Sequence, residues 1–77
     1  MVTVRVLVSL KPSLLDSAGR TVTNSLKGLH FDEVHNARIG KTITLTMESY
    51  DEDRVKAMCE KLLANPVIED YTIEVLP

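Results

Sequence analysis

The strongest constraint in this sequence is an alternating pattern at its start. Every second position is a valine with mostly polar residues between, and the exception on the polar side is Leu7. The valines are Val2, Val4, Val6 and Val8. A period of two is typical of a β-strand that buries one face and leaves the other toward water. We therefore predict that the chain begins with a half-buried strand.

The next segment has the pattern of an amphipathic helix that begins near Asp16 and ends near Gly28. An aspartate there can accept a hydrogen bond from a free backbone N–H, and glycine is common where helices stop. Gly19 in the first turn costs up to about 1 kcal/mol relative to alanine, which weakens the start of the helix. The expected apolar face consists of Ala18, Val22, Leu26 and Leu29.

A second amphipathic helix is predicted after residue 49, because Ser49 and Glu52 have the spacing of a capping box. Asn65-Pro66 should end it, since the residue before a proline is pushed away from helical geometry. The apolar stripe of this helix consists of Val55, Met58, Cys59, Leu62 and Leu63. A last strand is predicted over Val67 to Val75, where apolar and polar residues alternate again.

Two extended segments are predicted between the helices, at roughly Glu33 to Ile39 and Thr42 to Glu48. The second alternates apolar residues with threonine, whose β-branched side chain favours strands. Gly40 and Lys41 lie between the two segments, so we expect a tight hairpin in which Gly40 supplies a positive φ. The order of elements is therefore β-α-β-β-α-β.

This order is the split βαβ, or ferredoxin-like, arrangement and predicts an α+β fold. Four antiparallel strands should form one sheet, with both helices on the same face. The other face is expected to stay uncovered and to carry Thr3, Arg5, Leu7, Thr42, Thr44, Thr46, Thr72 and Glu74. The two edge strands of such a sheet can recruit another chain.

Composition and charge argue against several classes of function. A chain of 77 residues with 44% hydrophobic and 26% charged residues is typical of one small globular domain over residues 1–77, with a core that is marginal on its own. A net charge of -2 argues against nucleic-acid binding, and only Phe31, Tyr50 and Tyr71 are available to stack on bases. The start is too short an apolar run for a secretion signal or a membrane span, which predicts a cytoplasmic protein.

The sequence contains three weak candidates for chemistry. Gly40-Lys41-Thr42 resembles the end of a phosphate-binding loop, but His35 stands where that loop needs its first glycine. Cys59 lies among apolar residues and is interpreted as a core or interface thiol rather than a nucleophile. The loop after the first helix is polar but lacks zinc-type spacing, which favours a solvated loop over a metal site. That loop contains His30, Asp32, Glu33 and His35.

Three stretches resemble one protein family over nearly the whole chain. They are SLKPSLLDSAG after the first strand, VHNARIGKTITL in the middle and MCEKLLANPVIEDYTIEV at the end. They are similar to the PurS family, the small subunit of phosphoribosylformylglycinamidine (FGAM) synthase, and LLANPVIEDY is the most specific part. One departure is Ser17, where members commonly have a proline, and its absence should slightly loosen the start of the helix.

The resemblance implies a non-catalytic but required subunit of a purine-biosynthesis complex. In that complex PurL uses ATP and magnesium to activate the amide of formylglycinamide ribonucleotide, PurQ releases ammonia from glutamine, and PurS homodimers bridge the two. The chain would then belong to a carbon–nitrogen ligase without carrying catalytic residues, a metal or a cofactor of its own. The alternative is a small effector-binding regulatory module of the same fold.

The resemblance also marks candidate contacts with partner subunits. They are Arg38, Gly40 and Lys41 in the predicted hairpin and Asn65, Pro66, Ile68, Glu69 and Tyr71 in the terminal stretch. Arg38 and Lys41 are expected to present two cations at the hairpin tip of an acidic protein. That placement suits an acidic patch on a partner better than a free nucleotide.

Overall fold

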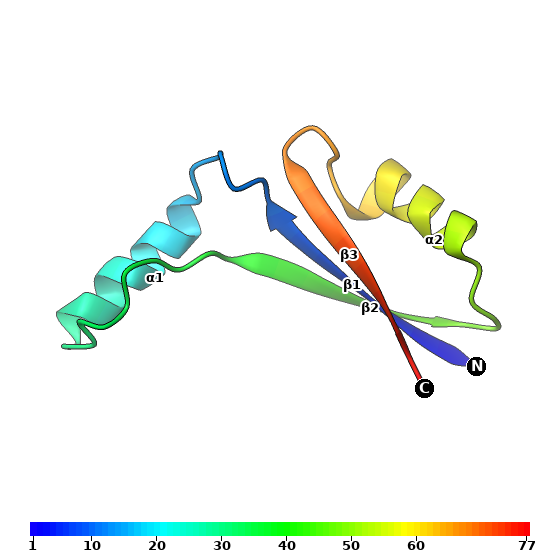
Figure 1. The fold of residues 1–77 in the computed structure, drawn as a ribbon, viewed down its shortest axis with the longest axis horizontal. Helices are drawn as coiled ribbons and strands as arrows, with labels where there is room; N and C mark the ends of the chain where they lie inside the picture. The colour runs from blue at the N-terminus through cyan, green and yellow to red at the C-terminus, as the bar shows by residue number, and fades with distance from the viewer.

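The computed structural model describes residues 1–77 and contains three strands, two α-helices and one π-helix (Figure 1). The elements in chain order are β1 (Val2–Leu10), α1 (Ser17–Gly28), β2 (Gly40–Met47), α2 (Glu52–Met58), η1 (Cys59–Leu63) and β3 (Glu69–Leu76). The π-helix η1 continues α2 without a break, so the two form one helical segment. None of the helices has the length and apolar character that crossing a membrane requires.

The strands form one antiparallel sheet in the order β2-β1-β3, with the valine-rich β1 in the centre. The register places Val6 between Ile43 and Ile73, so apolar residues of all three strands share one face. The opposite face carries the polar residues that were predicted for it. On that face the guanidinium of Arg5 lies 3.5 Å from the carboxylate of Glu74, across the β1–β3 pair.

The core is small and lies where α2 and η1 pack over the apolar face of the sheet. It consists of Val4, Val6, Val8, Val55, Cys59 and Ala64. Only 9 of 77 residues are buried, so this cluster is most of the interior. The predicted apolar stripe of the second helix is confirmed in part, because Val55 and Cys59 are fully buried whereas Leu62 is 82% exposed.

α1 does not pack on the sheet but projects from one end of the molecule as an arm (Figure 1). The extended segment 33–39 runs beside it and leads back into β2. Three of the four residues of the predicted apolar face of α1 are exposed, namely Ala18, Val22 and Leu29. Within one chain, therefore, only α2 and η1 cover the sheet, where two helices were predicted to do so.

A close backbone contact explains why α1 lies against the segment 33–39. A Cβ atom at Gly19 would overlap the carbonyl oxygen of Ala37, so the glycine is what allows the helix to approach the extended segment. Thr23, one turn further along, is also buried, and its hydroxyl donates to the carbonyl oxygen of Gly19 at 2.9 Å. The predicted cost of Gly19 in the helix is thus offset by a contact that no larger residue permits.

The ends of α1 are set by local hydrogen bonds. Asp16 is the N-cap, as predicted, and its carboxylate accepts from the backbone N–H of Gly19 at 2.8 Å. The helix ends at Gly28, as predicted, but the left-handed residue that follows is His30, with a φ of 72°. The N–H of His30 donates to the carbonyl oxygen of Lys27 at 3.0 Å, which satisfies one of the last helical carbonyls.

The second helix begins differently from the prediction. Asp51 is its N-cap and accepts from the backbone N–H of Arg54 at 3.3 Å, so the capping box of Ser49 and Glu52 is not used. Asp51 directly precedes the first helical residue, which gives its carboxylate the position that a cap requires. Asn65-Pro66 follows the helical segment, as predicted, and β3 begins only at Glu69 because residues 65–68 form a turn.

The middle of the chain contains one strand instead of the predicted hairpin. Gly40 pairs with Ser9 and Lys41 pairs with Val8 as the first residues of β2, and no glycine has a positive φ. A Cβ atom at Gly40 would lie 2.5 Å from the carbonyl oxygen of Val8. Glycine is therefore needed for the close approach of two strands rather than for a turn. Residues 33–39 accompany α1 instead, and the sheet has three strands where four were predicted.

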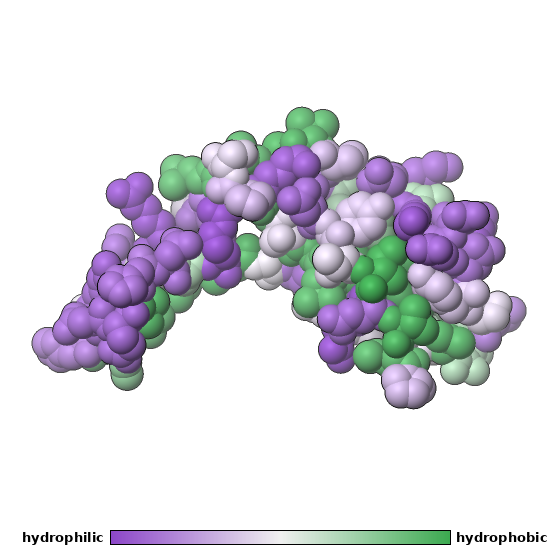
Figure 2. Space-filling model, viewed as in Figure 1, coloured by the Kyte–Doolittle hydropathy of each residue, from purple (hydrophilic) through white to green (hydrophobic).

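The long, thin shape leaves an unusually large surface exposed (Figure 2). The molecule measures 46 × 28 × 14 Å with a radius of gyration of 15.6 Å. A compact domain of this length has a radius of gyration of about 11.5 Å. The accessible surface of this chain is 5646 Å², compared with about 4,700 Å² for a typical folded monomer of this mass. The surplus of about 900 Å² is similar to the ~800 Å² that each partner buries in a stable interface.

Candidate protein-interaction surfaces

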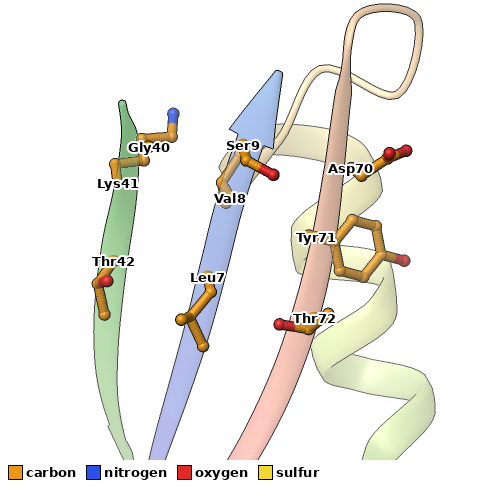
Figure 3. Close-up of a pocket in the computed structure, with 9 residues that line it drawn as sticks. All are labelled: Leu7, Val8, Ser9, Gly40, Lys41, Thr42, Asp70, Tyr71 and Thr72. Carbon is orange, nitrogen blue, oxygen red and sulfur yellow. The ribbon is translucent and has the colours of Figure 1, made fainter. Parts of the chain in front are cut away.

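A shallow hollow of about 410 Å³ lies where β1 ends and where β2 and β3 begin. All three strands contribute to it, and Figure 3 shows their side chains at the same level of the sheet. Its lining consists of Leu7, Val8, Ser9, Gly40, Lys41, Thr42, Asp70, Tyr71 and Thr72. Of the candidate contact residues, the fold thus brings Gly40, Lys41 and Tyr71 together, although they lie far apart in the sequence.

Opposite charges stand on the two edge strands of this hollow. Asp70 on β3 pairs with the ammonium of Lys11 at 3.0 Å. Lys41 on β2 is exposed and takes part in none of the ion pairs of the chain. Because the charge of Asp70 is already partly balanced, Lys41 is the cation of the hollow that is free to meet a carboxylate from another molecule.

Tyr71 forms one wall of the hollow from the side of the core. Its ring is half-buried and packs against the core cluster beside α2 and η1. Burial raises the pKa of the Tyr71 hydroxyl, and the nearby carboxylate of Glu60 acts in the same direction. The phenol therefore keeps its proton at neutral pH and remains a hydrogen-bond donor at the rim.

Arg38 is engaged within its own chain. Its guanidinium donates to three backbone carbonyl oxygens, one in the last residue of β1 and two in the connection between β1 and α1. They belong to Leu14 at 3.0 Å, Lys11 at 3.1 Å and Leu10 at 3.5 Å. Arg38 is therefore a brace between this connection and the segment 33–39. The predicted pair of cations at a hairpin tip does not form, because Arg38 is held here while Lys41 lies on β2.

Asp16 joins the same two segments from the other side. One carboxylate oxygen caps α1, and the other accepts from the backbone N–H of Ile39 at 2.6 Å. The side chain is only 6% exposed. The backbone N–H groups of Gly19 and Ile39 hold the pKa of Asp16 below its ordinary value, with a smaller contribution from the charge of Arg38. Sequence reasoning identified Asp16 as a cap but gave no signal for this second bond.

The terminal stretch 65–69 forms a hydrogen-bonded turn between η1 and β3. The side-chain oxygen of Asn65 accepts from the backbone N–H of Val67 at 3.1 Å. The backbone N–H of Asn65 donates to the carboxylate of Glu69 at 2.7 Å. Asn65 and Glu69 therefore build the turn. Of the candidate contacts in this stretch, Pro66 and Ile68 are exposed on the turn and remain free to meet a partner.

Exposed apolar side chains form the other class of candidate contact. They are Met1, Leu15, Val22, Leu29, Phe31, Ile39, Tyr50, Leu62, Val67, Ile68 and Val75. Periodicity predicted that Val22, Leu29 and Leu62 would be buried, and the structure shows that this prediction is wrong for a single chain. Val67 was predicted to begin the last strand, but it lies in the turn before β3. For Leu15, which lies in the connection between β1 and α1, the sequence gave no signal.

The candidates for chemistry have plain structural surroundings. Cys59 is fully buried in the core and burial raises the pKa of its thiol, which confirms the interpretation as a core cysteine. The predicted polar loop carries exposed side chains at His30, Asp32, Glu33 and His35. Nowhere in the chain do three His, Cys, Asp or Glu side chains gather in a metal-holding group.

The thin sheet, the projecting helix and the exposed apolar and charged side chains define a small assembly module. Comparisons with known proteins identify its family. The family model for PurS, "Phosphoribosylformylglycinamidine (FGAM) synthase", matches residues 3–77. The chain is 53% identical over 78 residues to the phosphoribosylformylglycinamidine synthase subunit PurS of Bacillus subtilis, covering 97% of this chain and 93% of that protein. It belongs to the PurS family.

Solved structures agree with this assignment. A crystal structure of Bacillus subtilis PurS has a TM-score of 0.91 and 51% identity, and covers 100% of both chains. A chain of the PurLQS structure from Thermotoga maritima has a TM-score of 0.85 and 30% identity, and covers 97% of this chain and 96% of that chain. The projecting arm and the three-stranded sheet therefore occur in a fold that the family shares.

Proposed function

We propose that this chain is the non-catalytic subunit of FGAM synthase that bridges the synthetase PurL and the glutaminase PurQ in the cytoplasm. Ammonia released from glutamine would then reach formylglycinamide ribonucleotide within one assembly. Membership of the PurS family carries this proposal, and the Thermotoga maritima relative belongs to a structure named PurLQS. The surplus of exposed surface on this chain supports a role in assembly.

The arm formed by α1 supports self-association as the first step. Its apolar side chains Val22 and Leu29 are exposed, and the sheet of the same chain has a helix over only part of its apolar face. If α1 covers the sheet of a second copy, that sheet gains the two-helix layer of the ferredoxin-like arrangement. A homodimer built in this way would bury the surplus surface on both chains.

Contacts with PurL and PurQ are proposed at two places, the hollow at the end of the sheet and the turn between η1 and β3. Lys41 with Gly40 and Tyr71 presents a cation beside a hollow, and Pro66 with Ile68 presents exposed apolar surface. Arg38, Asn65 and Glu69 act indirectly, because their hydrogen bonds hold the segments that carry these contacts. ATP, magnesium and glutamine are used by the partner subunits, and this chain supplies no ligands for them.

Reconstitution of the complex tests the proposal. PurL and PurQ from the same organism are assayed for glutamine-dependent synthase activity with and without this chain, and association is followed by size analysis. We expect full activity and a three-component complex only when the chain is present. Complete activity without it would overturn the bridging role, and a thermal shift with glutamine or purine nucleotides would then test an effector-binding module.

A further inference from the structure

A groove separate from the hollow lies on the arm, between α1 and the segment 35–38. Its volume is about 340 Å³ and its lining is predominantly polar. The side chains that matter for binding are Arg20, Asn24 and Lys27 on α1 and His35, Asn36 and Arg38 on the facing segment. None of these residues belongs to the hollow at the end of the sheet.

The groove carries a net positive charge in a chain whose net charge is -2. Arg20, Lys27 and Arg38 contribute three positive charges, and Asp16 is the only acidic residue in the lining. Both oxygens of Asp16 already accept backbone hydrogen bonds. The acidic residues closest along the sequence, Asp32 and Glu33, lie in the loop at the tip of the arm and do not line the groove.

Two of the three cations have no partner within the chain. The three ion pairs of the molecule use Arg5, Lys11 and Lys56, and no side-chain hydrogen bond involves Arg20 or Lys27. α1 contains no acidic residue that could pair with them. Seven residues separate Arg20 from Lys27, so they lie on one side of the helix about 10 Å apart along its axis.

The charged side of α1 points away from its apolar side. At about 100° per residue, Arg20, Asn24 and Lys27 centre roughly half a turn from Val22 and Leu29. Covering the apolar side with a second copy would therefore leave the groove accessible. At the start of α2, Asp51 caps the helix and Glu52 pairs with Lys56 at 3.3 Å, so Asp53 is the one carboxylate there outside any such contact, whereas the groove offers two unpaired cations.

We propose that this groove binds an acidic segment of a partner subunit of the synthase, with Arg20 and Lys27 pairing with two of its carboxylates. The proposal rests on the proposed function, since it requires that the chain assemble with such a partner. About 10 Å is the reach of three residues of extended chain, which suits carboxylates spaced along a peptide. The amides of Asn24 and Asn36 also line the groove and can bond the peptide backbone.

The test compares two double variants of the full chain in binding to purified PurL and PurQ. Arg20→Ala with Lys27→Ala removes the groove cations. Arg54→Ala with Lys61→Ala is the matched control, because these two cations are also exposed, also seven residues apart on a helical segment and also outside any ion pair. Helix content by circular dichroism and homodimer size are measured for both variants, and alanine at exposed helical positions should preserve them.

We expect the groove variant to bind its partner about 2- to 30-fold more weakly at physiological salt, the range for two exposed ion pairs. This difference should shrink as salt rises, because screening removes the same attraction from the wild-type chain. The control variant should bind like the wild type. Equal losses in both variants, or no loss in either at low salt, would overturn the groove as a binding site.

Two further outcomes keep this inference distinct from the proposed function. If the wild-type chain binds neither subunit, the bridging role fails, and the groove proposal fails with it. If the wild type binds and only the homodimer of the groove variant weakens, the occupant is a second copy and the partner proposal is wrong. Competition by inorganic phosphate beyond that of sodium chloride at equal ionic strength would instead identify a phosphate site.

Discussion

The three glycines of this chain occupy two kinds of environment, although all have negative φ values. A Cβ atom at Gly19 would overlap the backbone of Ala37, and one at Gly40 would lie 2.5 Å from the carbonyl oxygen of Val8. Nothing lies within 4 Å of the corresponding position at Gly28. Two glycines are therefore required by close backbone approach, and the third is only tolerated at the end of α1.

This contrast predicts opposite effects from the same substitution in one helix. Gly28→Ala should raise the free energy of unfolding by about 0.4–1 kcal/mol, because alanine reduces the freedom of the unfolded chain and meets open space. Gly19→Ala should lower it by about 1–3 kcal/mol, because overpacked positions force the backbone to shift. Urea unfolding followed by circular dichroism measures both. A stabilising Gly19→Ala would show that α1 does not lie against Ala37 as described.

At the scale of elements, periodicity predicted the three observed strands and both helices, because each has a clear apolar repeat. It could not predict where α1 packs. The apolar side of α1 has the same pattern whether it covers its own sheet or another surface, and the deciding contact is between Gly19 and the backbone of Ala37. The hairpin at Gly40 and Lys41 was predicted for a related reason, because glycine marks both turns and close strand approaches.

Among the candidate contact residues, Glu69 and Tyr71 are partly buried and the other six are exposed. The sequence could not predict which residues lie next to them in space. Lys41 on β2 and Tyr71 on β3 line one hollow because both strands pair with the central strand β1, where both residues are opposite Val8. Arg38 was predicted to face a partner, yet its guanidinium donates to carbonyl oxygens more than 20 residues earlier in the chain. Hydrogen bonds of this kind leave no periodic signature, so they become visible only when the segments are placed together.

The link between α1 and β2 predicts a dependence on pH. The pKa of Asp16 is lowered in the folded state, chiefly by the N–H groups of Gly19 and Ile39, so its contribution to stability is present above the unfolded pKa. That contribution is lost as the pH falls below about 4. Asp16→Asn should lower Tm at pH 7, because an amide cannot accept both bonds, and the difference from wild type should narrow toward pH 2.5.

The matched control is Asp51→Asn at the cap of α2. Asp51 makes one longer bond of 3.3 Å and is exposed, so its replacement should lower Tm less than that of Asp16 at pH 7. Thermal unfolding by circular dichroism at several pH values provides the comparison. A wild-type minus Asp16→Asn difference that stays constant from pH 7 to pH 2.5 would contradict the assigned role of the ionised carboxylate.

At the scale of the whole molecule, the small core and the surplus surface have one physical consequence. Only 9 of 77 residues are buried, so the hydrophobic contribution to folding is limited in an isolated chain. An interface that buries the exposed side of α1 adds apolar burial that the chain cannot obtain alone. Stability and association should therefore be linked, as they are in obligate dimers.

This linkage predicts that Tm rises with protein concentration for the wild-type chain. Val22→Glu with Leu29→Glu places charges on the exposed apolar side of α1 and should give a monomer with a lower, concentration-independent Tm. Ser17→Glu with Asn24→Glu is the matched control, because both residues are exposed, are also seven residues apart and lie on the other side of the same helix. Light scattering and thermal unfolding are measured from about 5 to 500 µM, because the Tm of a dimer that unfolds to monomers rises with concentration. A wild-type chain that is monomeric throughout, with a constant Tm, would show that the surplus surface serves only the other subunits.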